Sequence, residues 1–541
     1  MSKQKPIRHQ TVGALQIDLV LENIFKYLKI KDVAVCRMIN RHWGSVATPL
    51  FKGMISKVAV YFSLSRGQSD IDKYCDYVST IGPDCVKYSN FTFYEPKNAS
   101  LFLAKCGQHV ATLTFQWVLS DSLELLMEIL TSDEAPNLKT IEIADLSLDQ
   151  RSETFLNNYA VTKVATQIKT ISIKKCHTTT EIGQELFSRL FRMCPNLREA
   201  ITWSQSEQVL HGLLGADRAR NLSHLSLERM DRAILETLYR NKDQFHLKWL
   251  KIGHLHSIGG EQQFLGFLHV QANTLESFIV CAISNNLAGT GITFPKQMPN
   301  LKLLRLGLPR ISGCAKYINL STFLLDNWDQ QSPSVWGLEL PAGGLWPEHV
   351  QKLGHLFPNL KELSLGYQSG HALREIWTSF PGMESCTLCV GLDKTCNIDT
   401  AGFLKLDEIL TGFSKKEMKK AKKMCGDIGK PRFGSITNLK HLRELTVHSG
   451  PFRRRDQGVR LNNDCVTDIG LSYALQKLEA LKYLVIKGHS VSQKTVRDFC
   501  RVRDLYDDSS RGVLKLTSHP RSRYDSPHPM CMEDELNYVT T

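Results

Sequence analysis

The sequence predicts an α/β protein with a short N-terminal unit of three helices, a long array of repeats and a disordered C-terminal tail. Three observations support this prediction. Apolar residues follow a helical period near the N-terminus, a short apolar pattern recurs through most of the chain, and the end of the chain is rich in Ser, Pro, Arg and Asp. The predicted boundaries are 11–52 for the helical unit, 53–506 for the array and 507–541 for the tail.

The N-terminal unit is predicted from helical spacing. Apolar residues at i, i+3, i+4 and i+7 form one face of a first helix, and they are Leu21, Ile24, Phe25 and Leu28. A second helical run begins at Lys31, and a third runs from Arg41 to Phe51 and is closed by Pro49. Three short helices bury little apolar surface, so a unit this small is marginal alone. Its remaining apolar faces are therefore available to a partner.

The array is predicted from a pattern of one apolar residue, two variable residues, a second apolar residue, one variable residue and a third apolar residue. Clear copies start at Val110, Leu138, Ile168, Leu222, Leu247, Leu275, Leu301, Val335, Leu360, Leu442 and Leu481, weaker copies at Leu197 and Met383, and degenerate early copies at Ile55 and Tyr88. From Val110 to Met383, successive copies start 23 to 34 residues apart. Pro-Asn-Leu recurs at 136–138, 195–197, 299–301 and 358–360, always at the same phase.

In this motif the proline stops the preceding helix, the asparagine turns the chain and the leucine begins a strand. Each repeat is thus predicted to contain one strand and one helix. No single repeat can bury its apolar side chains, and stacking of neighbours forms the core. Helices are wider than strands, which predicts a curved solenoid with parallel strands on the concave side and helices on the convex side. The long interval between Met383 and Leu442 predicts an insertion near 393–435.

Composition excludes several classes of protein. With 42% hydrophobic and 22% charged residues, the chain has the composition of a soluble folded protein. No apolar run approaches the roughly 18 residues that span a bilayer, and no apolar signal core follows the basic N-terminus, so we expect a cytoplasmic or nuclear location and no membrane partner. The fifteen cysteines are scattered and fit small buried hydrophobic positions.

The net charge of +13 is partly local, since Lys415–Lys423 carries six lysines and one glutamate. This segment has three interpretations: a solvated helix face, a nuclear-localisation or acidic-partner patch, or a nucleic-acid site. The last is disfavoured because no aromatic side chains interleave the lysines for base stacking. Nucleic acid is therefore not an expected partner.

No catalytic or metal-binding pattern is found. Cys386, Cys389 and Cys396 suggest zinc, but Cys386 occupies the second apolar position of its repeat, and no second Cys/His pair lies at a zinc-finger spacing. The sequence contains no phosphate-binding P-loop, no H-E-x-x-H and no G-x-S-x-G motif. The repeats leave no room for a domain with a catalytic cysteine. We therefore expect no enzyme activity, no catalytic residues, no metal and no cofactor.

Strand residues that point out of the core are the candidates for binding a target protein. They flank the second and third apolar positions, because strand side chains alternate. Aromatic and arginine side chains commonly anchor protein interfaces. The candidate set therefore contains the aromatic residues, the arginine and one lysine at these positions: Trp203, Trp249, Lys251, Arg305 and Tyr483. The alternative is a register shifted by one residue, which would place the two tryptophans in the core.

The N-terminal unit resembles the F-box, and the array resembles leucine-rich repeats of the long, helix-containing kind. The F-box resemblance rests on Leu15, Asp18, Leu19-Val20, Ile24-Phe25, Leu28, Asp32-Val33, Cys36-Arg37, Ile39-Asn40 and Arg41-His42-Trp43. The chain departs from the family at Gln16, where a proline is usual, and so lacks the fixed backbone angle that proline provides.

The resemblance implies a non-catalytic substrate-recognition subunit of a cullin-type (SCF-like) E3 ubiquitin ligase. It implies a Skp-family adaptor, and through it a cullin, as partners, with an unknown protein as substrate. The adaptor-binding residues that it implies are Leu15, Leu19, Val20, Ile24, Phe25, Leu28, Val33 and Trp43. The alternative is a leucine-rich-repeat scaffold or inhibitor without a ubiquitin ligase, in which the three helices only cap the array.

Overall fold

The structure is a computed structural model. It describes residues 18–25, 27–28, 30–55, 59–62, 67–81, 88–203, 206–255, 260–283, 295–307, 328, 330–340, 345–368, 370–390, 403, 434–449, 466–468, 470–487, 489–507 and 513–517. The chain divides into two compact units, Met1–Leu227 and Glu228–Thr541, so the boundary falls inside the predicted array. Leu15, Gln16 and the Lys415–Lys423 segment lie outside the described residues.

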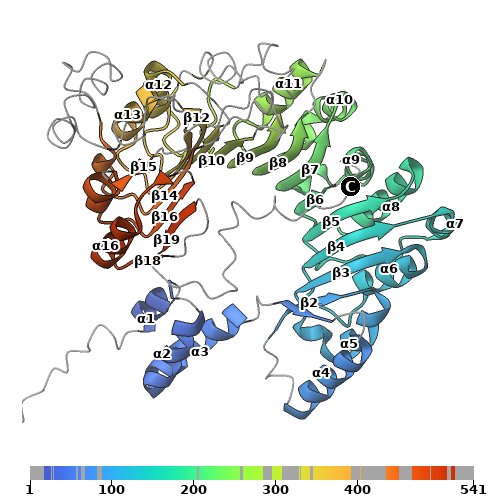
Figure 1. Cartoon of the computed structure of the whole chain (residues 1–541). Coiled ribbons are helices and arrows are strands. Elements are labelled where there is room, and N and C mark those ends of the chain that lie inside the picture. The colour runs from blue at the N-terminus through green and yellow to red at the C-terminus, as the bar shows by residue number, and fades with distance from the viewer. Residues whose placement is uncertain are drawn as a thin grey trace, which may run out of the picture. The chain divides into compact units, whose positions relative to one another are not determined.

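The first unit begins with the three predicted helices, α1 (Asp18–Phe25), α2 (Ile30–Ile39) and α3 (Arg41–Ile55) (Figure 1). We call them the helical module. Asn40 caps α3, because its Oδ1 accepts a hydrogen bond from the Trp43 N–H at 2.9 Å. The third helix is predicted to run from Arg41 to Phe51 with Pro49 as its stop signal, but Pro49 lies inside α3, which continues to Ile55.

A proline inside a helix costs about 3 kcal/mol, because it removes a hydrogen bond and crowds the preceding turn. The residues after Pro49 provide the compensation. Leu50, Phe51 and Met54 pack against the core of the helical module. Tertiary packing therefore outweighs the local stop signal.

The rest of the first unit alternates strands and helices. Its elements are β1 (Ala59–Tyr61), α4 (Gly67–Ile81), β2 (Asn90–Phe93), α5 (Lys97–Cys106), β3 (Thr112–Leu119), α6 (Leu123–Thr131), β4 (Thr140–Ser147), α7 (Gln150–Asn158), β5 (Thr170–His177), α8 (Thr180–Met193), β6 (Glu199–Thr202), α9 (Ser206–Gly215) and the start of β7 (His224–Met230), which crosses the boundary at Leu227. Strands β1 to β7 pair in sequence order, and every pairing is parallel. Helices α5 to α9 line one side of this ladder (Figure 1).

The second unit continues the same alternation. Its elements are α10 (Arg232–Arg240), β8 (Trp249–Leu255), α11 (Glu261–Gln271), β9 (Ser277–Ile283), β10 (Leu303–Leu306), β11 (Gly337–Leu340), α12 (Pro347–Leu356), β12 (Glu362–Gln368), α13 (Gly370–Ser379), β13 (Ser385–Val390), β14 (Glu444–Ser449), β15 (Val466–Thr467), β16 (Tyr483–Lys487), β17 (His489–Ser490), α16 (Gln493–Arg503), β18 (Tyr506–Asp507) and β19 (Val513–Thr517). Strands β8 to β14 and β16 form a parallel ladder, and β15 pairs with β17. Single turns of 3-10 or π-helix lie at Gly107–His109, Ser120–Ser122, Ala219–Asn221, Lys242–Gln244, Ile436–Asn438, Gly470–Ala474 and Leu475–Lys477.

The recurring apolar pattern predicts these strands correctly. Each copy that starts between Val110 and Leu481 coincides with one of the strands β3 to β14 and β16. The second apolar residues align across the ladder, as Leu113, Ile141, Ile171, Ala200 and Leu225 do in the first unit. All five are buried. Each unit is thus a mixed α/β array in which stacked repeats bury their apolar strand residues together.

The asparagine of each Pro-Asn-Leu motif ties its repeat to the preceding one. The Nδ2 atom donates a hydrogen bond to a backbone oxygen of that repeat in all four copies: Asn137 to Gln108 and Asn196 to Thr166 at 2.7 Å, Asn300 to Asn273 at 2.6 Å, and Asn359 to Pro333 at 2.9 Å. The sequence predicts a turn at this residue, and the structure adds a link between repeats.

We expect Asn196→Ala to lower the free energy of unfolding by about 1 kcal/mol, the usual contribution of one such hydrogen bond. Urea unfolding followed by circular dichroism measures the change. Asn157→Ala is the matched control, because Asn157 is exposed on α7. Equal unfolding midpoints for the two variants would contradict the proposed link between repeats.

The ordered chain extends past the predicted boundary of the tail at residue 507. Val513–Thr517 form β19, which pairs antiparallel with β16. Leu514 and Leu516 are buried, with the half-buried Lys515 between them. The tail prediction averaged composition over the whole segment and so missed this short apolar alternation. The region after Thr517 lies outside the described residues.

Candidate protein-interaction surfaces

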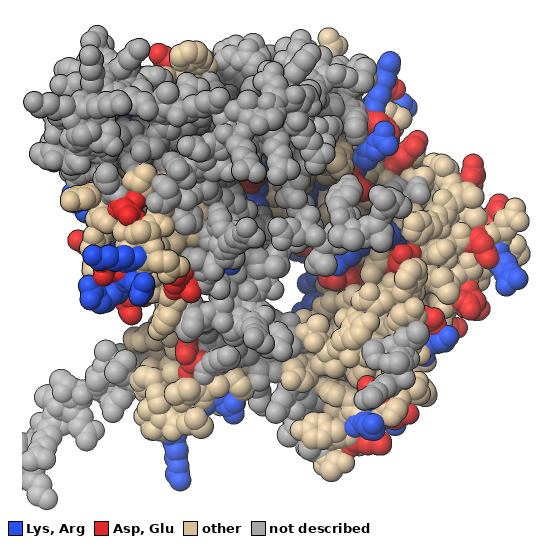
Figure 2. Space-filling view, in the orientation of Figure 1, with Lys and Arg blue, Asp and Glu red and all other residues tan. Residues whose placement is uncertain are grey.

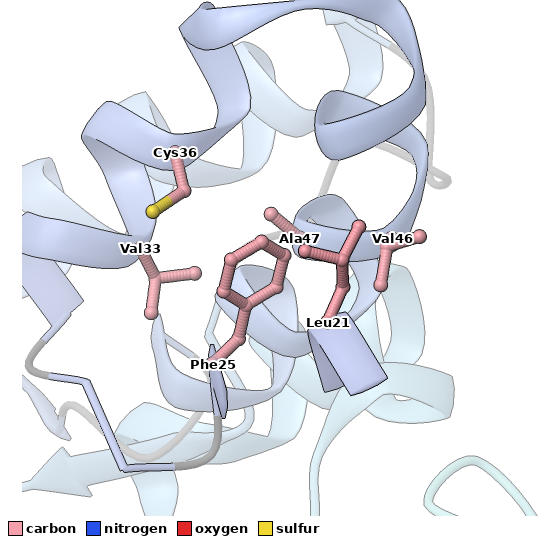
Figure 3. Packing of buried hydrophobic residues seen from close by; sticks show 6 residues of the cluster. All are labelled: Leu21, Phe25, Val33, Cys36, Val46 and Ala47. Carbon is pink, nitrogen blue, oxygen red and sulfur yellow. The ribbon is translucent and has the colours of Figure 1, made fainter. Parts of the chain in front are cut away.

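The helical module has a core of its own. Figure 3 shows the cluster of buried side chains, which consists of Leu21, Phe25, Val33, Cys36, Val46 and Ala47. Phe25 is central to it, and its ring packs edge-on against Trp43 with centroids 5.5 Å apart. Each of the three helices contributes side chains, so the packing of these residues fixes which helix faces point outward.

This core contains two residues that the sequence analysis assigned to the adaptor surface. Phe25 and Val33 are fully buried, so they hold the helices together and do not form part of the outer surface. Leu28 and Trp43 are partly buried and pack against the same cluster. Leu19 is 65% exposed and Ile24 is 40% exposed, and these two do lie on the surface. Val20 is half-buried.

The most exposed apolar stripe of the module lies on α2. Val35 is 57% exposed, Met38 80% and Ile39 54%. These residues stand at i, i+3 and i+4, so they share one helix face, which we call the α2 stripe. The opposite side of the helix carries Val33 and Cys36 in the core. Helix α2 is therefore apolar on two faces, of which only one is covered by its own chain.

The α2 stripe was missing from the predicted adaptor-binding residues. The i, i+3, i+4 spacing of its apolar residues is visible in the sequence. The stripe is found when the apolar residues on each face of the second helix are examined separately. In the view of Figure 2, most of the surface over α1 to α3 is formed by residues other than Lys, Arg, Asp and Glu. The exposed apolar side chains of the α2 stripe are the part of this surface that is typical of interaction sites on soluble proteins.

Contacts with α3 hold α2 in place. The Arg37 guanidinium lies over the Phe51 ring at 4.4 Å, and its Nε donates a hydrogen bond to Thr48 Oγ1 at 3.2 Å. Gly44 permits the close approach of the two helices, because a Cβ there would lie 2.9 Å from the Arg37 carbonyl oxygen. The α2 stripe is thus presented on a helix whose orientation is fixed by its neighbour.

The predicted target-binding residues occupy outward strand positions. Trp249, Lys251, Arg305 and Tyr483 are all half-buried and alternate with buried apolar residues, so the predicted register holds. Trp203 follows the buried Thr202 at the end of β6 and is also half-buried. Neither tryptophan belongs to the core, which excludes the register shifted by one residue.

These candidates do not form one compact site. Trp249 and Tyr483 lie in the same cross-strand row, but six strands separate them, which at about 4.8 Å per step is a distance of roughly 34 Å. Lys251 and Arg305 are nearer, with only β9 between their strands. Arg305 forms an ion pair with Glu339, with Nε 3.7 Å from Oε2. Trp203 belongs to the first unit.

The cysteines fit core positions. Of the eight cysteines whose side chains the structure describes, six are buried, among them Cys176, Cys194 and Cys386. Cys386 points into the core, as its repeat register predicts. Burial raises the pKa of Cys176 and of Cys194 to about 12. These thiols therefore stay protonated at neutral pH, which does not suit a nucleophile.

Within the residues that the structure describes, no three His, Cys, Asp or Glu side chains gather as metal ligands would. None of the described helices is both long and apolar enough to cross a bilayer.

Comparisons with known proteins give little further information. No protein-family model matches the chain, and no curated protein matches it. A crystal structure of the yeast Rad7 and Elc1 complex is similar, with 12% sequence identity and a TM-score of 0.37 over 90% of this chain and 95% of that chain.

Proposed function

We propose that this chain is a non-catalytic substrate-recognition subunit of a cullin-type E3 ubiquitin ligase. In this proposal the helical module binds a Skp-family adaptor, and through it a cullin, while the outward strand residues of the array bind the target protein. The chain acts in the cytoplasm or nucleus and carries out no chemistry itself. The observation that carries the proposal is the α2 stripe, an apolar face exposed on a small module with its own core.

The physical case rests on what the module leaves uncovered. Three apolar side chains on one helix face remain in water although the same helix buries others nearby. Burial of such a face against a partner is favourable by about 25 cal/mol per Å² of apolar area removed from water. Methionine is enriched at protein interfaces because its flexible side chain adapts to the partner surface.

The array supports the second half of the proposal. Repeats supply a long series of outward strand residues, among them Trp249, Lys251 and Arg305. A chain that binds adaptor and target at once holds the target near a ubiquitin-loaded enzyme, because tethering raises the effective concentration of the target's lysines. No catalytic group in this chain is needed for that effect.

Met38→Glu/Ile39→Glu tests the proposal. We expect the double variant to capture a Skp-family adaptor at least about tenfold more weakly than the parent chain, because charging buried interface anchors costs about 2 kcal/mol or more. Affinity of the purified chain for purified adaptor is the measurement. Both residues are exposed, so the substitutions should leave the module folded.

Leu101→Glu is the control, because Leu101 is an apolar residue on α5 that is 59% exposed outside the helical module. This variant should bind the adaptor as the parent does. If the α2 variant kept parental affinity while remaining folded, the adaptor proposal would fail, and the scaffold or inhibitor alternative would replace it.

A further inference from the structure

Three basic residues stand side by side at one edge of the first ladder. Lys139, Lys169 and Arg198 each follow the first apolar residue of consecutive repeats. The Lys169 N–H donates to the Lys139 carbonyl oxygen, and the Arg198 N–H to the Lys169 carbonyl oxygen, both at 2.8 Å. Residues joined in this way lie about 4.8 Å apart on neighbouring strands. We call these three residues the cationic row.

The cationic row is exposed, and Glu199, the acidic residue next to Arg198, pairs with His224. All three side chains are exposed, and among the described residues none of them has an acidic group within ion-pair distance. The same backbone ladder continues to Ala111 before the row and to Ser223 after it, and both are uncharged. Three positive charges are therefore stacked with no counter-charge at the neighbouring ladder positions.

In the second unit, acidic and basic residues are both found at the same repeat position. There Glu276 lies between Lys248 and Lys302, with ion pairs of 3.1 and 2.6 Å. Glu384 lies between Lys361 and Arg443, with ion pairs of 3.0 and 3.4 Å. Adjacent cations hold the pKa of both glutamates below its usual value. Opposite charges thus alternate in these two groups of three strands, although the ladder continues from Arg443 to a second cation, Lys482.

This contrast shows that the repeat fold does not require adjacent cations. Like charges directly opposite each other on neighbouring strands are destabilising, and alternation removes that cost. The first unit keeps three consecutive cations, and in the described part of the chain none of their side chains is in an ion pair that offsets the repulsion. Such a row is suited to an anionic ligand, and Arg198 adds a planar guanidinium that can bind a carboxylate through two hydrogen bonds.

We propose that the cationic row binds an acidic segment of a partner polypeptide through its Asp and Glu side chains. A polypeptide fits better than a nucleic acid, because no aromatic side chain stands in the row to stack on bases. The row is also short, with about 10 Å between its outer members, which matches a few carboxylates and not a phosphate backbone of many charges. The inference does not depend on adaptor binding.

The test uses the full chain and a fluorescein-labelled peptide of ten glutamates in low-salt buffer. We expect Lys139→Glu/Lys169→Glu to weaken binding by about tenfold or more, through loss of two attractive pairs and gain of two repulsive ones. Arg151→Glu/Lys174→Glu is the matched control, because it makes the same change in net charge at exposed positions of α7 and β5. The control should bind within about twofold of the parent.

Two results would overturn the proposal. One is an equal loss of binding in both variants, which would show attraction by total charge and no role for the row. The other is a single-stranded oligonucleotide of ten phosphates that displaces the peptide and binds more tightly than it, with the same loss in Lys139→Glu/Lys169→Glu. That result would make a nucleic acid the ligand. Adaptor affinity measured on the same variants should not change, which separates this test from that of the helical module.

Discussion

Gln271→Leu is expected to lower the free energy of unfolding of the second unit by about 3 kcal/mol, because three backbone groups lose a hydrogen bond at once and two of these bonds are buried. Gln271 is only 1% exposed at the end of α11. Its Oε1 accepts from the Leu247 N–H at 3.0 Å, and its Nε2 donates to the Lys242 and Phe245 carbonyl oxygens, each at 3.0 Å. Leucine fills similar space but replaces none of these bonds.

Urea unfolding with tryptophan fluorescence measures this effect. Gln262→Leu is the control, since Gln262 is exposed on the same helix and should change stability by less than about 0.5 kcal/mol. Gln271→Glu provides a second check, because a carboxylate cannot donate to the two carbonyl oxygens and a buried charge adds its own cost. A Gln271→Leu variant as stable as the parent would mean that the three backbone groups find other partners.

Phe25→Ala is expected to unfold the helical module while the repeats stay folded. Truncation of a buried phenylalanine typically costs about 3–5 kcal/mol. That is as large as the whole stability of a unit of this size, which has little core to spare. Phe25 is fully buried among residues of the module itself, so the loss should stay local. Under the proposed function, adaptor binding disappears with the module.

Hydrogen exchange by mass spectrometry distinguishes the outcomes. Amides of 18–55 should exchange rapidly in Phe25→Ala, while those of β3 to β5 keep their protection. Tyr27→Ala is the control, because Tyr27 is only two residues away and is 91% exposed. Parental protection of 18–55 in Phe25→Ala would show that the module draws its stability from contacts beyond its own core.

The array could be predicted from sequence because its pattern specifies burial residue by residue. An apolar residue at every second strand position indicates which side chains face the core. The indicated residues are buried even in weak copies of the pattern such as the one that starts at Leu197. Outward positions follow by alternation, which is why Trp249 and Arg305 were placed correctly. Local periodicity and tertiary packing give the same result in a repeat protein.

The surface of the helical module could not be predicted as well. Its second helix is apolar on two faces, and sequence periodicity does not say which of them the neighbouring helices cover. Phe25 and Val33 became core, while Met38 became surface, through packing between three helices. The same competition between local and tertiary effects carried α3 past Pro49.

The cationic row needed the register of the ladder. Lys139 and Arg198 are 59 residues apart in the chain, and nothing local connects them. Only the backbone pairing of consecutive strands brings them to within two strand spacings. The density of charge along the sequence is highest at Lys415–Lys423, so it does not indicate the cationic row.

The antiparallel strand β19 also determines how the parallel ladder ends. Strand β16 is strongly apolar, with Leu484 and Ile486 fully buried, and β19 pairs with it along its whole length. Without that partner, β16 would offer a free row of backbone donors and acceptors to the strands of other molecules, which is the usual route to aggregation. A truncated chain that ends before Val513 should therefore be judged first by its solubility, and loss of activity in such a chain would say little about binding.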